Sequence, residues 1–527
     1  MIPPMIRLLI VLAVCGSLQA ACNLQHAPKT ELSRGGDADL GARVAATAKP
    51  RPPAAKPTAQ ATAESAAPTP TIDRCRIEAG RPTRRISADV AVDYSAKTAA
   101  ISQRIEFLNR EDAVLDQIIL DVQANQWPDS FSLESLTIDG QTRPYELDLN
   151  RLQIDLAEPL AAGCWLEISL RFQLRVSEIR DGLRSYRGFL GYSPRQLNLG
   201  HFLPTVAARL GGAWRIHAPA GIGEQIVHAV ADWEVKLRVD NAAETLQLAA
   251  PGAVKSIGEL AWMIRLPGSR DLALSLSEEF DLLERQLPDG RSLAVYSFAD
   301  AQVNDRGLIL DGAAHALSES VKAFELFERR FGRYPYDRLV IVQGDFPDGM
   351  EFTGLVFVGS AWFYGFDGTA KNYLTLISVH EIAHQWWYAR VGNDAALSPW
   401  LDEALATYSE YLYIEEFYPD EKNWWWYFRV AVYLPEGGVD SAVYEFSTPR
   451  EYINAVYLRG AQMLQNIRDD IGDESFFRLL RAYNEAGDGL IVDSAFFWRQ
   501  LAPDQQPLTA ATRNEFLANP AVYAPAG

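Results

Sequence analysis

Cysteine is scarce in this sequence, and its scarcity excludes one class of zinc protein. Only 4 of the 527 residues are cysteine. Cys75 and Cys164 are the two that lie beyond the N-terminal segment, and neither has a cysteine or histidine partner at the spacing of a zinc ligand pair. A cysteine-based zinc module is therefore not expected. In an oxidising compartment Cys75 and Cys164 can form one disulfide, and the alternative is two buried thiols.

Basic residues are also few relative to acidic ones. The chain has 49 Lys and Arg against 68 Asp and Glu, which gives a formal net charge of -19. No basic run offsets this charge beyond the short pair Arg84 and Arg85. Because the phosphates of a nucleic acid would be repelled by such a surface, we expect no nucleic-acid partner.

The apolar run near the N-terminus is too short to span a membrane stably. It covers residues 8–14, it follows Arg7, and small residues lead from it to Cys22. This order is typical of a secretory signal peptide, so we expect residues 1–22 to direct export.

Cys22 suggests how the exported chain is held. The two residues before it, Ala20 and Ala21, make this segment similar to the lipobox of a bacterial lipoprotein, although Gln19 stands where an aliphatic residue is usual. We expect a protein that is lipid-anchored through Cys22 at the outer face of a bacterial membrane, with no other membrane contact. The alternative is cleavage after Ala20 and a soluble, secreted form.

Large apolar residues are almost absent from residues 23–72, which consist mainly of Ala, Pro, Thr and Lys. Such a composition cannot bury enough surface to fold, so this segment is predicted to be a disordered linker. From 73 to 290 the pattern changes to short runs in which apolar and polar residues alternate, separated by turn signals such as Asp139–Gly140. This pattern predicts a β-rich domain.

The β-rich domain shows no catalytic cluster in its sequence. Its three histidines, His201, His217 and His228, are scattered, and each is predicted to be a core or surface residue and not a ligand. Residues 291–527 differ, because helical and strand patterns are mixed there. They include an amphipathic helix at 313–331 and a strand at 338–346.

One motif in this second region carries chemistry. His380, Glu381 and His384 form the pattern H-E-x-x-H within residues 373–390, a run without Pro or Gly that is apolar around most of its surface. The run predicts a buried helix. Positions i and i+4 of a helix lie one above the other, so His380 and His384 would direct both imidazoles at one point.

Glu403 is the candidate for a third ligand, eighteen residues after His384. Ser398 and Pro399 predict the start of a second helix, which would place Glu403 one turn into it. A catalytic zinc takes three protein ligands and leaves one position open, and a carboxylate commonly completes a pair of histidines. We therefore predict one Zn²⁺ held by His380, His384 and Glu403.

Glu381 directly follows the first ligand and so lies near the metal but off the ligand line. A carboxylate in this position can take a proton from water and pass it to a leaving amine. The alternative is a helix that holds two histidines by chance. The helical context, the spacing to Glu403 and the second helix favour a zinc hydrolase.

Several separated segments resemble the zinc aminopeptidases of the aminopeptidase N type, within the thermolysin-like gluzincins. HEIAHQWW (380–387) and WLDEALATYSEYLY (400–413) are similar to the family's two zinc-binding segments and have the same gap. GMEF (349–352) resembles its G-x-M-E-N segment, and YLRG (457–460) resembles its Y-x-K-G segment. The similarity runs from about 310 to 500.

The resemblance implies a role for each matched residue. Glu351 would hold the free α-amine of a peptide substrate, in a pocket shaped by Gly349 and Met350. Tyr457 would donate a hydrogen bond to the oxyanion of the tetrahedral intermediate. Tyr444 and Tyr452 are neighbouring alternatives for this donor that rank below Tyr457.

Four positions beside Glu351 and Glu403 depart from the family pattern. Asp348 and Phe352 replace the first glycine and the asparagine of G-x-M-E-N. Asp402 and Ala404 also stand beside Glu403 where the family commonly has Asn and Gly. These changes alter the surroundings of Glu351 and Glu403 and leave both carboxylates in place.

We therefore expect a multidomain α+β protein. A β-rich N-terminal domain would precede a thermolysin-like α/β zinc peptidase domain, without the large helical C-terminal domain of longer family members. The predicted function is that of a zinc-dependent metallopeptidase, an aminopeptidase that removes N-terminal residues from peptides. An endopeptidase or another hydrolase on the same zinc site is the first alternative, and a non-catalytic surface protein that binds peptides or serves as a scaffold is the second.

Overall fold

The computed structural model describes residues 74–75, 82–179 and 188–523. The predicted signal peptide, the lipid-anchor cysteine Cys22 and the predicted linker at 23–72 lie outside the described residues. Among the helices that the structure does describe, none combines the length and the apolar character needed to cross a bilayer.

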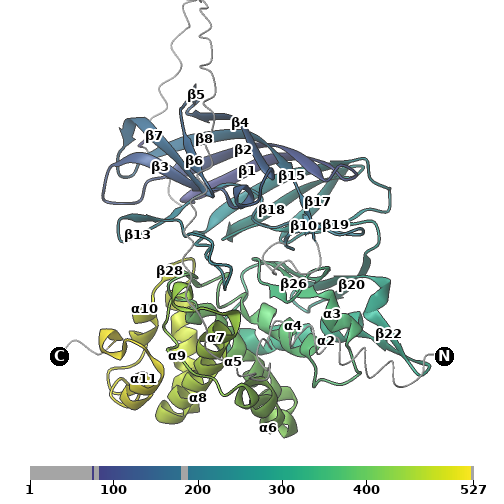
Figure 1. Ribbon diagram of the computed structural model, residues 1–527, viewed down its shortest axis with the longest axis vertical. Coiled ribbons are helices and arrows are strands. Elements are labelled where there is room, and N and C mark those ends of the chain that lie inside the picture. Colours follow the sequence, from purple (N-terminus) through teal and green to yellow (C-terminus); the bar gives the residue numbers. More distant parts are fainter. Residues whose placement is uncertain (1–73, 76–81, 180–187, 524–527) are drawn as a thin grey trace, which may run out of the picture. The chain divides into compact units, whose positions relative to one another are not determined.

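The N-terminal part is built from strands that alternate buried and exposed residues (Figure 1). In β2, for example, Ala99, Ile101 and Ile105 are buried between more exposed neighbours, the alternation expected of a strand with one face in the core. Its largest sheet has eight strands, in the order β17 (Ala253–Gly258), β18 (Ala261–Ser269), β15 (Ala231–Asp240), β1 (Arg84–Asp93), β2 (Thr98–Leu108), β8 (Trp165–Arg175), β4 (Phe131–Ile138) and β5 (Gln141–Thr142).

Two smaller sheets and a hairpin complete this part. Asp139 and Gly140 join β4 to β5 with φ angles of 49° and 76°, the left-handed pair that a tight hairpin needs. The smaller elements are β12 (Thr205–Val206), β3 (Leu115–Asp121), β7 (Arg151–Leu160) and β6 (Glu146–Asp148) in one sheet; β16 (Gln247–Ala249), β19 (Leu274–Ser277), β11 (Leu197–Leu199), β10 (Leu190–Tyr192) and β9 (Ser177–Glu178) in another; and the hairpin β13 (Ala208–Leu210) with β14 (Ala213–Arg215).

The two cysteines beyond the N-terminal segment form a disulfide. Cys75 is bonded to Cys164, which directly precedes β8, and 89 positions separate the two residues in the sequence. Of the two alternatives that the sequence leaves open, the structure has the bonded one.

The second part is centred on a mixed five-stranded sheet in the order β20 (Asp281–Gln286), β21 (Ser292–Ser297), β24 (Arg338–Gly344), β26 (Leu355–Gly359) and β25 (Gly349–Met350). The three central strands run parallel and are fully buried apart from Arg338 at the start of β24, whereas the edge strands are antiparallel to their neighbours. The predicted boundary between 290 and 291 falls between β20 and β21, two paired strands of this one sheet.

Helices pack on this sheet and continue to the end of the described chain (Figure 1). The first, α2 (Gly312–Phe331), agrees with the amphipathic pattern, and Asp311 caps it by accepting a hydrogen bond of 2.9 Å from the Ala314 amide. The others are α3 (Ser360–Tyr364), α4 (Tyr373–Ala383), α5 (Trp400–Phe417), α6 (Lys422–Trp425), the π-helix η5 (Trp426–Val430), α7 (Pro449–Tyr452), the π-helix η8 (Ile453–Leu458), α8 (Arg459–Ile471), α9 (Asp473–Ala486), α10 (Ser494–Trp498) and α11 (Ala510–Phe516).

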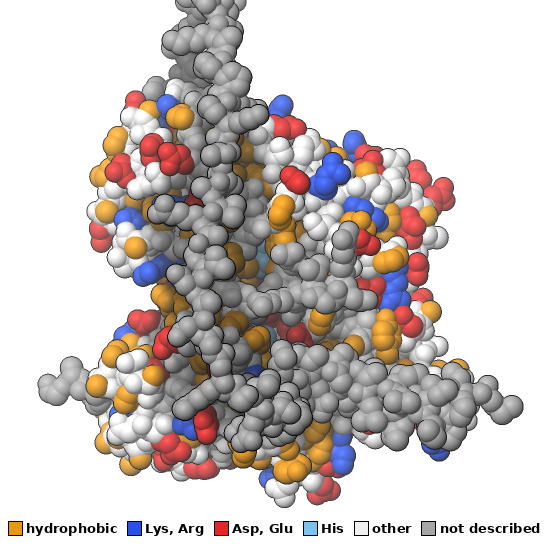
Figure 2. All heavy atoms as spheres, in the orientation of Figure 1, with side chains coloured by type: hydrophobic (Ala, Val, Ile, Leu, Met, Phe, Trp, Pro, Cys, Tyr) orange, Lys and Arg blue, Asp and Glu red, His pale blue; other side chains and the backbone are white. Residues whose placement is uncertain are grey.

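The surface carries charges of both signs. On the face drawn in Figure 2, red Asp and Glu side chains lie among blue Lys and Arg side chains.

One ion pair joins the β-rich part to the loop after β24. Arg195 donates to the two carboxylate oxygens of Asp345 over 2.8 and 2.7 Å, and Asp345 also accepts from Ser193 and Ser360, each over 2.8 Å.

Asp345→Asn is expected to lower the free energy of unfolding by about 2 kcal/mol at pH 7, because it weakens several charge-assisted hydrogen bonds at once. Burial opposes ionisation of Asp345, but the hydrogen bonds from Arg195, Ser360 and Ser193 outweigh it and hold the pKa of this carboxyl below its ordinary value. Because the pKa of Asp345 is lower in the folded protein than in the unfolded chain, its ionised carboxylate stabilises the folded state above about pH 4. This stabilisation is lost as the pH falls further. Urea unfolding at pH 7 and pH 3.5 should therefore show a difference that shrinks at the lower pH. A difference independent of pH would contradict this account, and Asp116→Asn, an exposed position, is the control.

Candidate active site

The first two site histidines lie at the end of α4. Asn372 caps this helix by accepting a hydrogen bond of 3.0 Å from the Thr375 amide. The prediction of a helix through to Arg390 was wrong at its end, because α4 stops at Ala383 and residues 384–390 form turns. The amides there bond three to five residues back, as in Gln385 N to Ile382 O (3.1 Å) and Ala389 N to His384 O (2.9 Å). His384 keeps a right-handed helical backbone, so its ring still lies against that of His380, with 4.8 Å between the centroids.

Glu403 approaches the histidines from α5. This helix begins at Trp400 with Pro399 in the cap position, and no side chain caps it, so Ser398 does not have the capping role expected of it. Glu403 lies in the first turn, where its Oε2 is 3.2 Å from His380 Nε2 and 3.6 Å from His384 Nε2. The structure therefore brings the three predicted ligands together, and all three are buried.

The orientation of both rings fits a Zn²⁺ ion between these three residues. His384 Nδ1 lies 3.1 Å from the Trp387 carbonyl oxygen, which can only accept, so Nδ1 carries the proton and Nε2 has a free lone pair. His380 Nδ1 likewise faces the Glu410 carboxylate at 2.9 Å. Ligand atoms bound tetrahedrally to zinc lie about 3.3 Å apart, close to the two separations from Glu403.

Glu410 was not predicted from the sequence. It is fully buried on α5, and it accepts hydrogen bonds of 2.9 Å from both Arg429 Nε and Arg429 Nη2 and one of 3.3 Å from Trp425 Nε1. A carboxylate behind a ligating histidine fixes its tautomer and ring orientation. The available signal was the seven-residue spacing from Glu403, which places both carboxylates on one face of the helix.

Glu410→Gln is expected to weaken zinc binding by about 10- to 100-fold, because His380 loses the carboxylate that orients it while the ligands themselves remain. Competition with a chelator of known affinity would measure the change. Unaltered zinc affinity would mean that Glu410 serves only to neutralise Arg429.

Glu381 lies directly against the backbone of β25. Its Oε2 is buried and has no hydrogen-bond partner among the described residues, so this oxygen is available to a water molecule or a substrate. Burial raises the pKa of Glu381 to about 8, against the opposing effect of His380 and His384. A Cβ added at Gly349 would lie 2.0 Å from the Glu381 Oε1 atom, so only glycine leaves room for this carboxylate.

Gly349→Ala is expected to reduce turnover at least about 10-fold with zinc still bound, because the new methyl group displaces the Glu381 carboxylate and misplacing a catalytic group by about 1 Å is costly. The values of kcat and the zinc content of the purified variant would test this. Gly258→Ala is the control, since its Cβ would meet nothing closer than 3.6 Å. Full activity in Gly349→Ala would show that Glu381 does not act from this position.

Glu351 follows β25 and faces the same centre. One carboxylate oxygen each of Glu351 and Glu381 lies within 4.8 Å of a ring nitrogen of His384. Met350 is buried beside it and pairs with Phe357 across the sheet. Asp348, which stands in place of the family's first glycine, has a φ of 65°, a conformation that Asp tolerates better than most residues.

Tyr457 lies beside His380 on the π-helix η8. The two rings are parallel within 3°, with 6.0 Å between their centroids. Tyr452 packs on the edge of Tyr457, whereas Tyr444 is 47% exposed and donates to the Ala218 carbonyl over 2.8 Å. Of the three tyrosines considered, Tyr457 is therefore the one stacked on the histidine pair.

A loop of the β-rich part also reaches this site, which sequence patterns did not indicate. A Cβ at Gly223 would lie 2.7 Å from the Tyr452 ring. The next residue, Glu224, has a pKa well above the ordinary value, first because of burial and then because of the charges of Glu351 and Glu403. A further carboxyl group therefore lies near Glu351, and its surroundings favour its neutral form.

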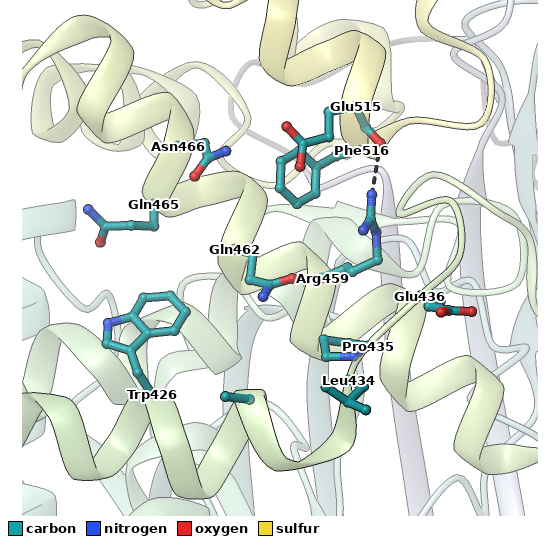
Figure 3. Close-up of a pocket in the computed structure, with 11 residues that line it drawn as sticks. Trp426, Leu434, Pro435, Glu436, Arg459, Gln462, Gln465, Asn466, Glu515 and Phe516 are labelled. Carbon is teal, nitrogen blue, oxygen red and sulfur yellow. Dashed lines mark hydrogen bonds between the residues drawn. The ribbon is translucent and has the colours of Figure 1, made fainter.

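A separate pocket lies elsewhere on the helical part (Figure 3). It has a volume of about 660 Å³, and the Arg459 guanidinium on its wall donates to the Glu515 carbonyl oxygen over 2.8 Å. None of its lining residues is a predicted site residue. The predicted site residues lie instead around His380 and His384.

Comparison with known proteins finds relatives of the region that holds these residues. Residues 315–513 match the peptidase family M1 domain. Aminopeptidase M1-A of Oryza sativa subsp. japonica is 27% identical over 221 residues, which cover 39% of this chain and 24% of that protein. Aminopeptidase N of Lactobacillus delbrueckii subsp. lactis is 32% identical over 204 residues, which cover 33% of this chain and 24% of that protein. The matched region thus spans about a quarter of the length of these relatives.

The fold has a counterpart among solved structures. The M1 zinc metallopeptidase of Deinococcus radiodurans superimposes with a TM-score of 0.60 at 17% identity, over 81% of this chain and 92% of that one. The likeness extends beyond the matched domain into the β-rich part. Residues 315–513 therefore resemble the peptidase family M1 domain, and the relatives that match this region include aminopeptidase N.

Proposed function

We propose that this protein is a zinc-dependent aminopeptidase, with a thermolysin-like catalytic domain, that removes N-terminal residues from peptides. His384 belongs to two buried clusters of side chains, and this observation carries the proposal. The first cluster also contains His380 and Glu403, and the second contains Glu351 and Glu381. The first cluster suits a single Zn²⁺ ion, and the second offers two carboxylates, one for a peptide's amine and one for its attacking water.

The bound Zn²⁺ supplies Lewis-acid polarisation of water and of the scissile carbonyl. Glu381 accepts a proton from the attacking water and then delivers it to the leaving amine. Its burial suits both steps, since a carboxyl group whose pKa is raised toward neutrality can hold and release a proton at working pH.

Glu351 holds the α-ammonium group of the substrate through charge-assisted hydrogen bonds. Tyr457 donates its hydroxyl hydrogen to the oxyanion as negative charge develops on the carbonyl oxygen. Peptide substrates agree with the solved D. radiodurans neighbour, one variant of which is bound to a Tyr-Ser-Ala substrate.

The test is hydrolysis of aminoacyl fluorogenic substrates beside their N-acetylated twins, before and after chelation and after zinc is restored. Chelator-sensitive cleavage of the free-amine set alone is the expected result. Cleavage of the acetylated set would assign an endopeptidase to the same site, and no cleavage of either set by zinc-loaded protein would favour a peptide-binding protein.

We also propose that the protein is exported and anchored through a lipid on Cys22. The Cys75–Cys164 disulfide supports an oxidising compartment. The intact mass of the mature chain from the membrane fraction should correspond to a diacylated or triacylated Cys22. A soluble product that begins at Ala21 would support secretion instead.

A further inference from the structure

Two histidines of the β-rich part are buried without hydrogen-bond partners. His201 is 5% exposed and His228 is 7% exposed, and none of their four ring nitrogens has a partner among the described residues. Their rings meet edge to face, with 5.1 Å between the centroids. An unsatisfied polar atom costs about 1–3 kcal/mol when it is buried. Two such side chains in contact therefore point to a ligand that binds between them.

Asp271 completes a set of three with these histidines. One ligand atom from each of His201, His228 and Asp271 lies within 4.8 Å of the other two. The three residues come from separate segments: after β11, before β15 and between β18 and β19. His201 also has a φ of 49°, in the left-handed region that a side chain rarely adopts. The fold thus brings three distant groups together and accepts backbone strain at one of them.

We propose that His201, His228 and Asp271 bind a second Zn²⁺ ion, with a structural role, separate from the catalytic site. Two neutral imidazoles and a carboxylate form a common zinc donor set. The ligand atoms need to approach one another by at most about 1.5 Å to reach tetrahedral spacing. The ion would add positive charge near the buried Arg270 guanidinium. The carboxylates of Asp121 and Asp271, both buried, offset that charge, and Asp121 Oδ2 lies 3.9 Å from His228 Nε2.

The surroundings of Asp271 show what this ion would hold. Asp271 Oδ1 accepts a hydrogen bond of 2.8 Å from the Thr353 amide, and Oδ2 accepts one from the Tyr388 hydroxyl. Thr353 is two residues beyond Glu351, and Tyr388 follows the turn that begins at His384. Phe352 packs on His201, with 4.6 Å between ring centroids. The second ion therefore fastens the β-rich part to the segments that carry the catalytic residues.

Zinc stoichiometry tests the proposal without reference to activity. The full chain is loaded with Zn²⁺, desalted, and analysed for metal by mass spectrometry. We expect two ions per chain in the parent, one in His380→Ala/His384→Ala, one in Asp271→Asn, and none when these changes are combined. Asp271→Asn keeps the size of the side chain and one of the two oxygens that accept hydrogen bonds from Thr353 and Tyr388, so it should fold. His315→Asn, which changes a histidine outside both sets, should keep two ions.

Thermal unfolding gives a second measurement on the same proteins. In the His380→Ala/His384→Ala background, added Zn²⁺ should raise Tm, and Asp271→Asn should remove that rise. Co²⁺ in this background should show the visible absorption of a four-coordinate ion. Three results would overturn the proposal: one ion in the parent, no ion in His380→Ala/His384→Ala, or an ion that survives both Asp271→Asn and His228→Leu. Each would mean that buried water, and not Zn²⁺, occupies the cluster.

Discussion

Glu381→Gln is expected to lower kcat by about 10² to 10⁴ fold while the zinc content stays at the parent value. The amide has nearly the same shape as the carboxylate, so it fits beside Gly349, but it cannot accept the proton of the attacking water. The substrate contacts remain, so KM should change little. Steady-state kinetics on a free-amine substrate, together with metal analysis, measures both quantities.

Two comparisons make this result specific to Glu381. Glu325→Gln, an exposed carboxylate on α2, should keep full activity. The pH profile of residual activity in Glu381→Gln should lose the ionisation that the parent owes to this group. Turnover close to that of the parent would remove Glu381 from the mechanism, and loss of the metal would mean that Glu381 also supports the ligands.

Glu351→Ala is expected to lower kcat/KM for free-amine substrates by about 10- to 100-fold, because a charge-assisted hydrogen bond is worth about 1.5–3 kcal/mol. N-acetylated substrates carry no charge at this point and should be affected far less. The selectivity between the two sets is therefore the quantity to measure. Equal losses on both sets would refute amine binding by Glu351.

Inhibitor binding gives the same comparison without turnover. An amino-acid hydroxamate should lose affinity for Glu351→Ala, whereas its analogue without the α-amine should bind parent and variant alike. Glu224→Gln is a useful partner variant, since it replaces a neighbouring carboxyl group with an amide of similar size and leaves Glu351 in place. The raised pKa of Glu224 favours its neutral form, so a much smaller change in amine selectivity is expected there.

Much of the candidate site could be predicted, because the spacing of residues within one or two helices specifies it. The i, i+4 spacing of His380 and His384 places both rings on one helix face even though α4 ends between them. Glu403 could be chosen because it lies in the first turn of a second recognisable helix. The end of α4 could not be predicted, since no Pro or Gly marks it and the turns at 384–390 depend on the packing around them.

Other parts of the site required the fold. Glu410 is an ordinary helical glutamate in the sequence, and only the approach of α4 and Arg429 makes it a support for His380. Glu224 lies in the loop between β14 and β15 of the β-rich part, and this loop brings it close to Glu351. His201 and His228 were assigned to core or surface positions because no spacing links them, and the structure places them in contact.

By itself, the sequence determined that one helix carries His380 and His384 and that Glu403 lies in the first turn of the next helix. It also determined the alternation of apolar and polar residues that predicts the strands of the β-rich part. Each follows from periodicity within one or two elements, which short-range backbone geometry imposes. Only the tertiary structure decided that Gly349 leaves room for Glu381, that Glu410 orients His380, and that His201, His228 and Asp271 converge. These contacts join residues far apart in the chain, and their distances depend on how sheets and helices pack, which no local pattern encodes.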